Sequence, residues 1–94
     1  MVENIKTYNL LFSGRVQGVG FRYFVESIAN KNGIKGYVRN IYNEKVEVVC
    51  QGKEEDLKHF IDEIKKGPSF SAVTNIETRE IEGSNEYGTF EIRY

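Results

Sequence analysis

Two kinds of hydrophobic pattern follow one another along the chain and predict its elements. Apolar and polar residues alternate, or β-branched residues cluster, in five segments that are expected to be strands: residues 6–13, 35–41, 46–51, 73–82 and 89–94. Apolar residues recur at spacings of three and four in two segments that are expected to be helices: residues 21–32 and 54–66. Gly33 follows the first helix and Gly67-Pro68 the second, as is common where helices end.

The order of these segments predicts the fold. Strand, helix, strand, strand, helix and strand follow one another, with one further short strand. Each helix has one apolar stripe, and an antiparallel sheet with both helices on one face gives both stripes a shared surface. Because strand–helix–strand crossovers are right-handed, this order predicts a ferredoxin-like α/β sandwich of the α+β class. With 94 residues, the chain has room for a single domain over residues 1–94.

The segment from Gly14 to Arg22, Gly-Arg-Val-Gln-Gly-Val-Gly-Phe-Arg, lies between the first strand and the first helix. Its glycines permit positive φ and let backbone N–H groups converge on a ligand. The helix adds its own N–H groups, and Arg22 in its first turn offers a guanidinium that matches phosphate or carboxylate oxygens. The segment therefore predicts an anion-binding loop. A lesser alternative is that Arg22 only pairs with Glu26 on the helix surface.

Two common glycine motifs do not fit this loop. It lacks the lysine and hydroxyl residue of the nucleotide-triphosphate loop, and Tyr23 stands where the dinucleotide fingerprint has its third glycine. Neither ATP nor NAD follows from it as a ligand.

Composition and charge limit the remaining classes. A net charge of −1 argues against a nucleic-acid partner, although the half of the chain with the loop is the more basic one. No apolar run approaches the ~18 residues of a membrane span, and residues 1–4 lack the pattern of an export signal, so a cytoplasmic location is expected. Cys50 continues an apolar alternation and is expected to be buried, and His59 is expected to be solvated or half-packed. No metal site and no cofactor are predicted.

Beside the loop, several short segments carry a resemblance that covers nearly the entire chain: Gly36-Tyr37-Val38-Arg39-Asn40, Val46-Glu47-Val48, Gln51-Gly52, Gly67-Pro68 and Phe90-x-Ile92-Arg93-Tyr94. In this combination the chain resembles the acylphosphatases and the acylphosphatase-like domains of larger proteins. The resemblance implies a ferredoxin-like fold and metal-independent hydrolysis of an acyl phosphate to a carboxylate and inorganic phosphate. It also implies catalytic residues Arg22 and Asn40 and a phosphate-binding loop formed by Arg15, Val16, Gln17, Gly18, Val19 and Gly20.

The resemblance assigns a role to each part of the site. Arg22 would hold the phosphoryl oxygens, the loop amides would share their charge, and Asn40 would orient the attacking water through its side-chain amide. Taken alone, an Asn before a turn is more often a turn-former. No residue stands out as a general base, which fits a mixed anhydride whose carboxylate leaves easily. The expected partners are a small acyl phosphate and inorganic phosphate as product inhibitor, with no membrane and with the chain as a monomer.

Two matters stay open at this point. Acylphosphatases usually have Asp-Gly where this chain has Asn43-Glu44, and Glu adopts a left-handed backbone reluctantly, so the geometry of the turn between the second and third strands is undecided. The chain could also be a non-catalytic anion-binding or regulatory module, or a carbamoyl-phosphate-acting relative of hydrogenase-maturation domains.

Overall fold

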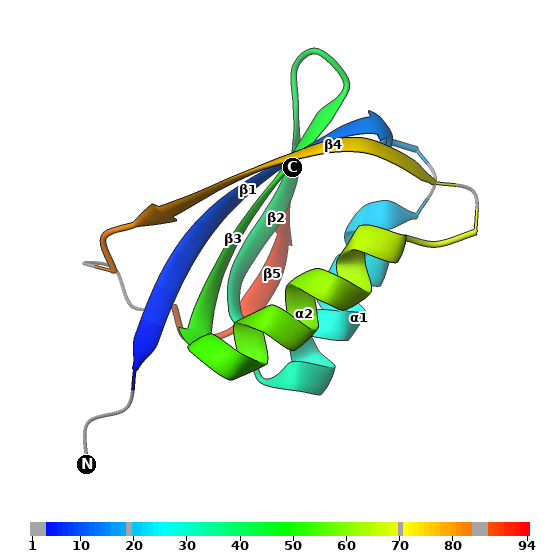
Figure 1. Ribbon diagram of the computed structural model, residues 1–94. Coiled ribbons are helices and arrows are strands. Elements are labelled where there is room, and N and C mark those ends of the chain that lie inside the picture. Colours follow the sequence, from blue (N-terminus) through cyan, green and yellow to red (C-terminus); the bar gives the residue numbers. More distant parts are fainter. Residues whose placement is uncertain (1–3, 19, 70, 84–86) are drawn as a thin grey trace.

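The computed structural model describes residues 4–18, 20–69, 71–83 and 87–94. In this part of the chain, two helices lie side by side on one face of a five-stranded sheet (Figure 1). The elements are β1 (Ile5–Arg15), α1 (Phe21–Asn32), β2 (Lys35–Ile41), β3 (Lys45–Lys53), α2 (Glu54–Lys66), β4 (Ala72–Ile81) and β5 (Phe90–Arg93). Both helices have the predicted bounds, and the strand ends differ from prediction by no more than one or two residues.

The sheet confirms the ferredoxin-like sandwich and corrects one detail of it. Its strand order is β4-β1-β3-β2-β5. β1 pairs antiparallel with β3 and β4, and β2 pairs antiparallel with β3, but β5 runs parallel to β2, so the sheet is mixed rather than wholly antiparallel. β4 runs opposite to β1 and β2, whereas β5, at the other edge of the sheet, runs in the same direction as β2.

The core forms between the sheet and the helices because the two periodicities meet there. Apolar residues of period two on the strands face apolar residues of helical spacing on α1 and α2. The buried core residues are Leu10, Phe12, Val16, Phe21, Val25, Ala29, Ile34, Val38, Val46, Val48, Cys50, Leu57, Phe60, Ile64 and Phe90. Phe12 of β1 and Phe21 of α1 have ring centroids 5.2 Å apart, so the start of α1 is held directly against the end of β1.

One end of the sandwich collects the segments that matter for the candidate site. β1, β2 and β5 run in the same direction, so their carboxyl ends lie together, and α1 begins at that end because it follows β1 after a short connection. The turn between β2 and β3 lies at this end as well (Figure 1).

The turn between β2 and β3 resolves the question that the sequence left open. Asn43 and Glu44 both have positive φ, 65° and 60°, as a tight hairpin turn with two left-handed residues requires. A left-handed backbone costs a non-glycine residue roughly 1–2 kcal/mol, so Glu44 is held there by the pairing of the strands on either side. Ile41 and Lys45 form the last strand pair before the turn.

Candidate active site

The loop between β1 and α1 is shaped by two left-handed glycines. Gly18 and Gly20 have φ of 72° and 78°. Val16 is buried and anchors the loop, while Arg15 at the end of β1 is exposed. A Cβ at Gly18 or Gly20 would meet no heavy atom within 4 Å, so the space beside the backbone is open to a ligand. Val19, which was also predicted to belong to the loop, lies outside the described residues.

The first turn of α1 faces this loop without a capping side chain. Gly20 is the N-cap and has no side-chain oxygen to offer, and the first turn carries no acidic residue. The Phe24 N–H donates to Gly20 O at 3.0 Å and closes the turn. The N–H groups at the start of the helix and the positive end of its dipole are therefore suited to an anion.

Arg22 lies half-buried in that first turn and is held by the C-terminal end of β5. Its Nη1 lies 3.5 Å from Arg93 O, and its Cζ lies 4.7 Å from the centre of the Tyr94 ring. A side-chain hydrogen bond with Tyr23 raises the pKa of Tyr94 and links that ring to α1. Within the described part of the chain Arg22 makes no ion pair with Glu26, so the surface-pair alternative is not what the structure shows.

Asn40 carries a buried acceptor that no described residue satisfies. Asn40 lies two residues after Val38 in β2, so both side chains are on the helix-covered face of the sheet. It pairs with Val46 of β3. Among the described residues, Asn40 Oδ1 is the buried side-chain oxygen or nitrogen without a hydrogen-bond partner. Such an atom costs roughly 1–3 kcal/mol if it stays unpaired, so a donor from a water or a ligand is expected to meet it.

The side chain of Gln17 leaves the loop and contacts the hairpin. Its Nε2 donates to Ile41 O and to Lys45 O, each at 2.8 Å. The resemblance places Gln17 among the residues around the phosphate, but its amide nitrogen is occupied by these two backbone carbonyls. Any contact of Gln17 with an anion at this site therefore falls to its backbone.

Arg93 and Tyr94 are neighbours of the candidate site that the sequence did not single out for it. The alternation of Phe90, Ile92 and Tyr94 could have placed Tyr94 on the helix-covered face, the side on which Arg22 lies. It could not have shown that β5 lies beside β2, which is what brings these residues to the start of α1.

Cys50 and His59 have the surroundings that the sequence predicted for residues without a catalytic role. Cys50 is buried in the core, and burial raises the pKa of its thiol to about 12. His59 is exposed on α2. The described residues hold no group of three His, Cys, Asp or Glu side chains that could bind a metal ion, and none of their helices is long and apolar enough to cross a membrane.

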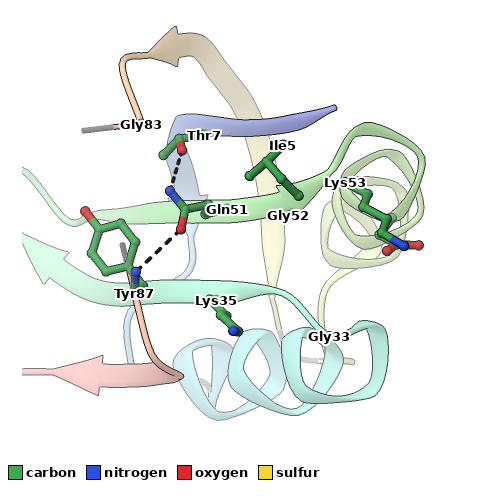
Figure 2. A pocket seen from close by; sticks show the side chains of 10 residues that line it. Ile5, Thr7, Gly33, Lys35, Gln51, Gly52, Lys53, Gly83 and Tyr87 are labelled. Atoms are coloured by element: carbon green, nitrogen blue, oxygen red, sulfur yellow. Dashed lines mark hydrogen bonds between the residues drawn. The ribbon is translucent and has the colours of Figure 1, made fainter. Parts of the chain in front are cut away.

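Two of the hollows in the described part of the chain are lined by neither Arg22 nor Asn40. One, of about 480 Å³, lies between the loop and the hairpin turn and is lined by Gly14, Arg15, Val16, Gln17, Asn43 and Glu44. The other, of about 510 Å³, lies at the opposite end of the sheet, where Gln51 Nε2 donates to Thr7 Oγ1 and Gln51 Oε1 accepts from Tyr87 N (Figure 2). The second hollow is slightly larger, yet it contains neither the unpaired acceptor nor the uncapped helix start, so size does not identify the site.

Comparison with known proteins shows which family the chain is similar to. A sequence profile described as Acylphosphatase matches residues 8–92. The acylphosphatase of Bacillus velezensis is 42% identical over 87 residues, covering 93% of this chain and 97% of the relative. A probable carbamoyltransferase HypF of Methanocaldococcus jannaschii is 48% identical over 80 residues, covering 84% of this chain and 10% of that protein. The crystal structure of acylphosphatase from Bacillus subtilis superimposes with a TM-score of 0.91 at 39% identity, covering 95% of this chain and 99% of that one. The chain belongs to the acylphosphatase family.

Proposed function

We propose that this protein hydrolyses acyl phosphates to a carboxylate and inorganic phosphate at the end of the sandwich that holds the loop, Arg22 and Asn40. The observation that carries this proposal is the buried, unpaired Oδ1 of Asn40 at the same end of the sandwich as the start of α1, which has no capping side chain. An anion cradle alone would only bind phosphate. Because no donor among the described residues meets the Asn40 oxygen, it is available to accept a hydrogen bond from the attacking water.

Binding of the phosphoryl group falls to the loop and Arg22. The open space beside Gly18 and Gly20 lets backbone N–H groups approach the oxygens closely, and the first turn of α1 adds its dipole. The Arg22 guanidinium is pre-oriented by Arg93 O and the Tyr94 ring and supplies a full positive charge. Together these groups stabilise the charge that spreads over the phosphoryl oxygens in the transition state.

The chemical step needs little more than a water held in the correct position for attack on phosphorus. The side-chain oxygen of Asn40 accepts a hydrogen bond from a water and leaves the water's lone pair free to attack phosphorus in line. The bond between phosphorus and the carboxylate oxygen breaks, and the carboxylate leaves with the bonding electrons. A phosphoryl oxygen takes the proton of the water. No side chain has to act as a base because the leaving group is already a good one.

Carbamoyl phosphate is a candidate within the same substrate class, because it is the acyl phosphate of carbamic acid. The similarity to the Methanocaldococcus jannaschii carbamoyltransferase favours testing it, although this chain spans only 10% of that protein. Product inhibition by inorganic phosphate, a monomeric state and a cytoplasmic location are further parts of the proposal.

A turnover assay tests the function. Purified protein is given benzoyl phosphate or carbamoyl phosphate, and phosphate release is followed with and without a chelator. Hydrolysis that is inhibited competitively by phosphate and unchanged by chelation supports the proposal. Binding of phosphate without turnover of either substrate would identify a non-catalytic anion-binding module, and activity lost on chelation and restored by a divalent ion would overturn metal independence.

A further inference from the structure

The side chain of Gln17 joins two parts of the candidate site that the sheet itself keeps apart. The phosphate-binding loop follows β1, and Asn40 belongs to β2. In the strand order β4-β1-β3-β2-β5, β3 lies between these two strands. The register between β1 and Asn40 therefore passes through Val46 of β3, which pairs with both Phe12 and Asn40, and the loop lies beyond the last of these β1–β3 pairs. The contact from Gln17 joins the loop directly to the hairpin.

The contact uses the full donor capacity of the amide. A glutamine amide nitrogen has two hydrogens, and Gln17 Nε2 donates to Ile41 O and Lys45 O, each at 2.8 Å. Both acceptors are carbonyl oxygens, so the nitrogen rather than the oxygen of the amide must face them. Two short bonds from one nitrogen to both strands of a hairpin fix a position as well as a direction.

The two acceptor carbonyls belong to the strand pair next to Asn40, so a contact with them helps to fix the position of Asn40. Ile41 follows Asn40 directly in β2, and the pair Ile41–Lys45 is adjacent to the pair Asn40–Val46. Beyond them the chain enters the turn with two consecutive left-handed residues, so contacts from outside the turn help to hold this end of the hairpin. On the other side, Gln17 is adjacent in sequence to Gly18, whose open side faces the ligand space.

We propose that Gln17 is a positioning residue that holds the phosphate-binding loop and Asn40 in register for in-line attack. The inference rests on the proposed function, because it needs a phosphoryl group in the loop and a water at Asn40. Gln17 acts through these partners and its side chain does not touch the substrate. Its loss therefore moves the water relative to phosphorus while the loop amides and Arg22 still bind the anion.

A double-mutant cycle with Asn40 tests this role. Gln17→Met keeps the length of the side chain and removes both donors, and Gln17→Ala serves as a second variant in case Met packs badly. We expect either change to lower kcat by about ten- to a hundred-fold, since a displacement of about 1 Å can cost that much. The inhibition constant for phosphate should stay within about three-fold of the parent. In an Asn40→Ala background, which has no placed water to lose, the same change should alter kcat by less than about two-fold.

A matched control comes from the opposite end of the sheet. Gln51 also donates from Nε2 to an oxygen on a neighbouring strand, Thr7 Oγ1 at 2.9 Å (Figure 2). Gln51→Met should leave kcat and phosphate inhibition unchanged. Circular dichroism and thermal unfolding establish that each variant is folded at the assay temperature.

The outcomes separate this inference from the proposed function. Losses in kcat that are equal in the parent and in the Asn40→Ala background would show that Gln17 supports the loop in general and would overturn its positioning role. An inhibition constant for phosphate that rises as much as kcat falls would do the same. Either result leaves the roles of Arg22 and Asn40 intact. If Asn40→Ala alone keeps the parental kcat, the proposed placement of water fails, and the register role of Gln17 fails with it.

Discussion

Replacing Glu44 by glycine should make the protein more stable, because Glu44 has φ of 60° in the turn between β2 and β3. A residue with a Cβ pays roughly 1–2 kcal/mol for the left-handed conformation, and glycine pays nothing. Glycine also makes the unfolded chain more flexible, which offsets roughly 0.5–1 kcal/mol of that gain. The net expectation is a stabilisation of about 0.5–1 kcal/mol, or a rise in Tm of roughly 2–8 °C for a domain of this size.

Thermal and urea unfolding of the parent and of Glu44→Gly measure this change, with the dependence on urea expected to keep its slope. Glu80→Gly is the matched control, because Glu80 is exposed on β4 and is not among the residues with positive φ. That variant should lose roughly 0.5–1 kcal/mol, as glycine does within a strand. A Glu44→Gly variant that melts at or below the parental temperature would contradict the strain assigned to the turn.

Gly14→Ala should destabilise the protein by more than about 2 kcal/mol in urea unfolding, because a Cβ there would overlap the carbonyl oxygen of Ala72. Gly18→Ala and Gly20→Ala should weaken both phosphate inhibition and turnover, because each glycine has positive φ and borders the proposed phosphate site. Unchanged values in both variants would mean that the loop does not bind the phosphate. The thiol of Cys50 keeps its proton in the folded protein up to about pH 12, so stability should fall as pH rises from the ordinary thiol pKa towards that value, more steeply than in Cys50→Ala.

The elements and the glycine-rich loop before α1 were predictable because they depend on local patterns. The 3.6-residue spacing of α1 and the glycines before it place Arg22 at a helix start whatever the rest of the chain does. The family resemblance then drew attention to Asn40, which its residue type and position alone would have left as a turn-former. Its buried, unpaired oxygen is a property of the folded structure.

The remaining features depend on contacts between distant segments. A period of two marks a strand but not its direction, so the parallel pairing of β5 with β2 was not predictable, and neither was the position of Tyr94 over Arg22. The contact of Gln17 with the hairpin spans 24 and 28 residues along the chain and leaves no local signal. Glu44 shows the reverse case, since strand pairing imposes a backbone conformation that the residue disfavours.

In the proposed mechanism, Arg22 binds the phosphoryl group and Asn40 binds only the attacking water. Steady-state kinetics of Arg22→Ala and Asn40→Ala, with phosphate as inhibitor and on variants shown by circular dichroism to be folded, test it most directly. Arg22→Ala should abolish phosphate inhibition and lower turnover by about 10²–10³, the equivalent of roughly 2–4 kcal/mol for a charge-assisted contact. Asn40→Ala should lower kcat by a comparable factor while its inhibition constant for phosphate stays within a few-fold of the parent. An Asn40→Ala variant that keeps its kcat, or that loses phosphate binding as severely as Arg22→Ala, would contradict this assignment.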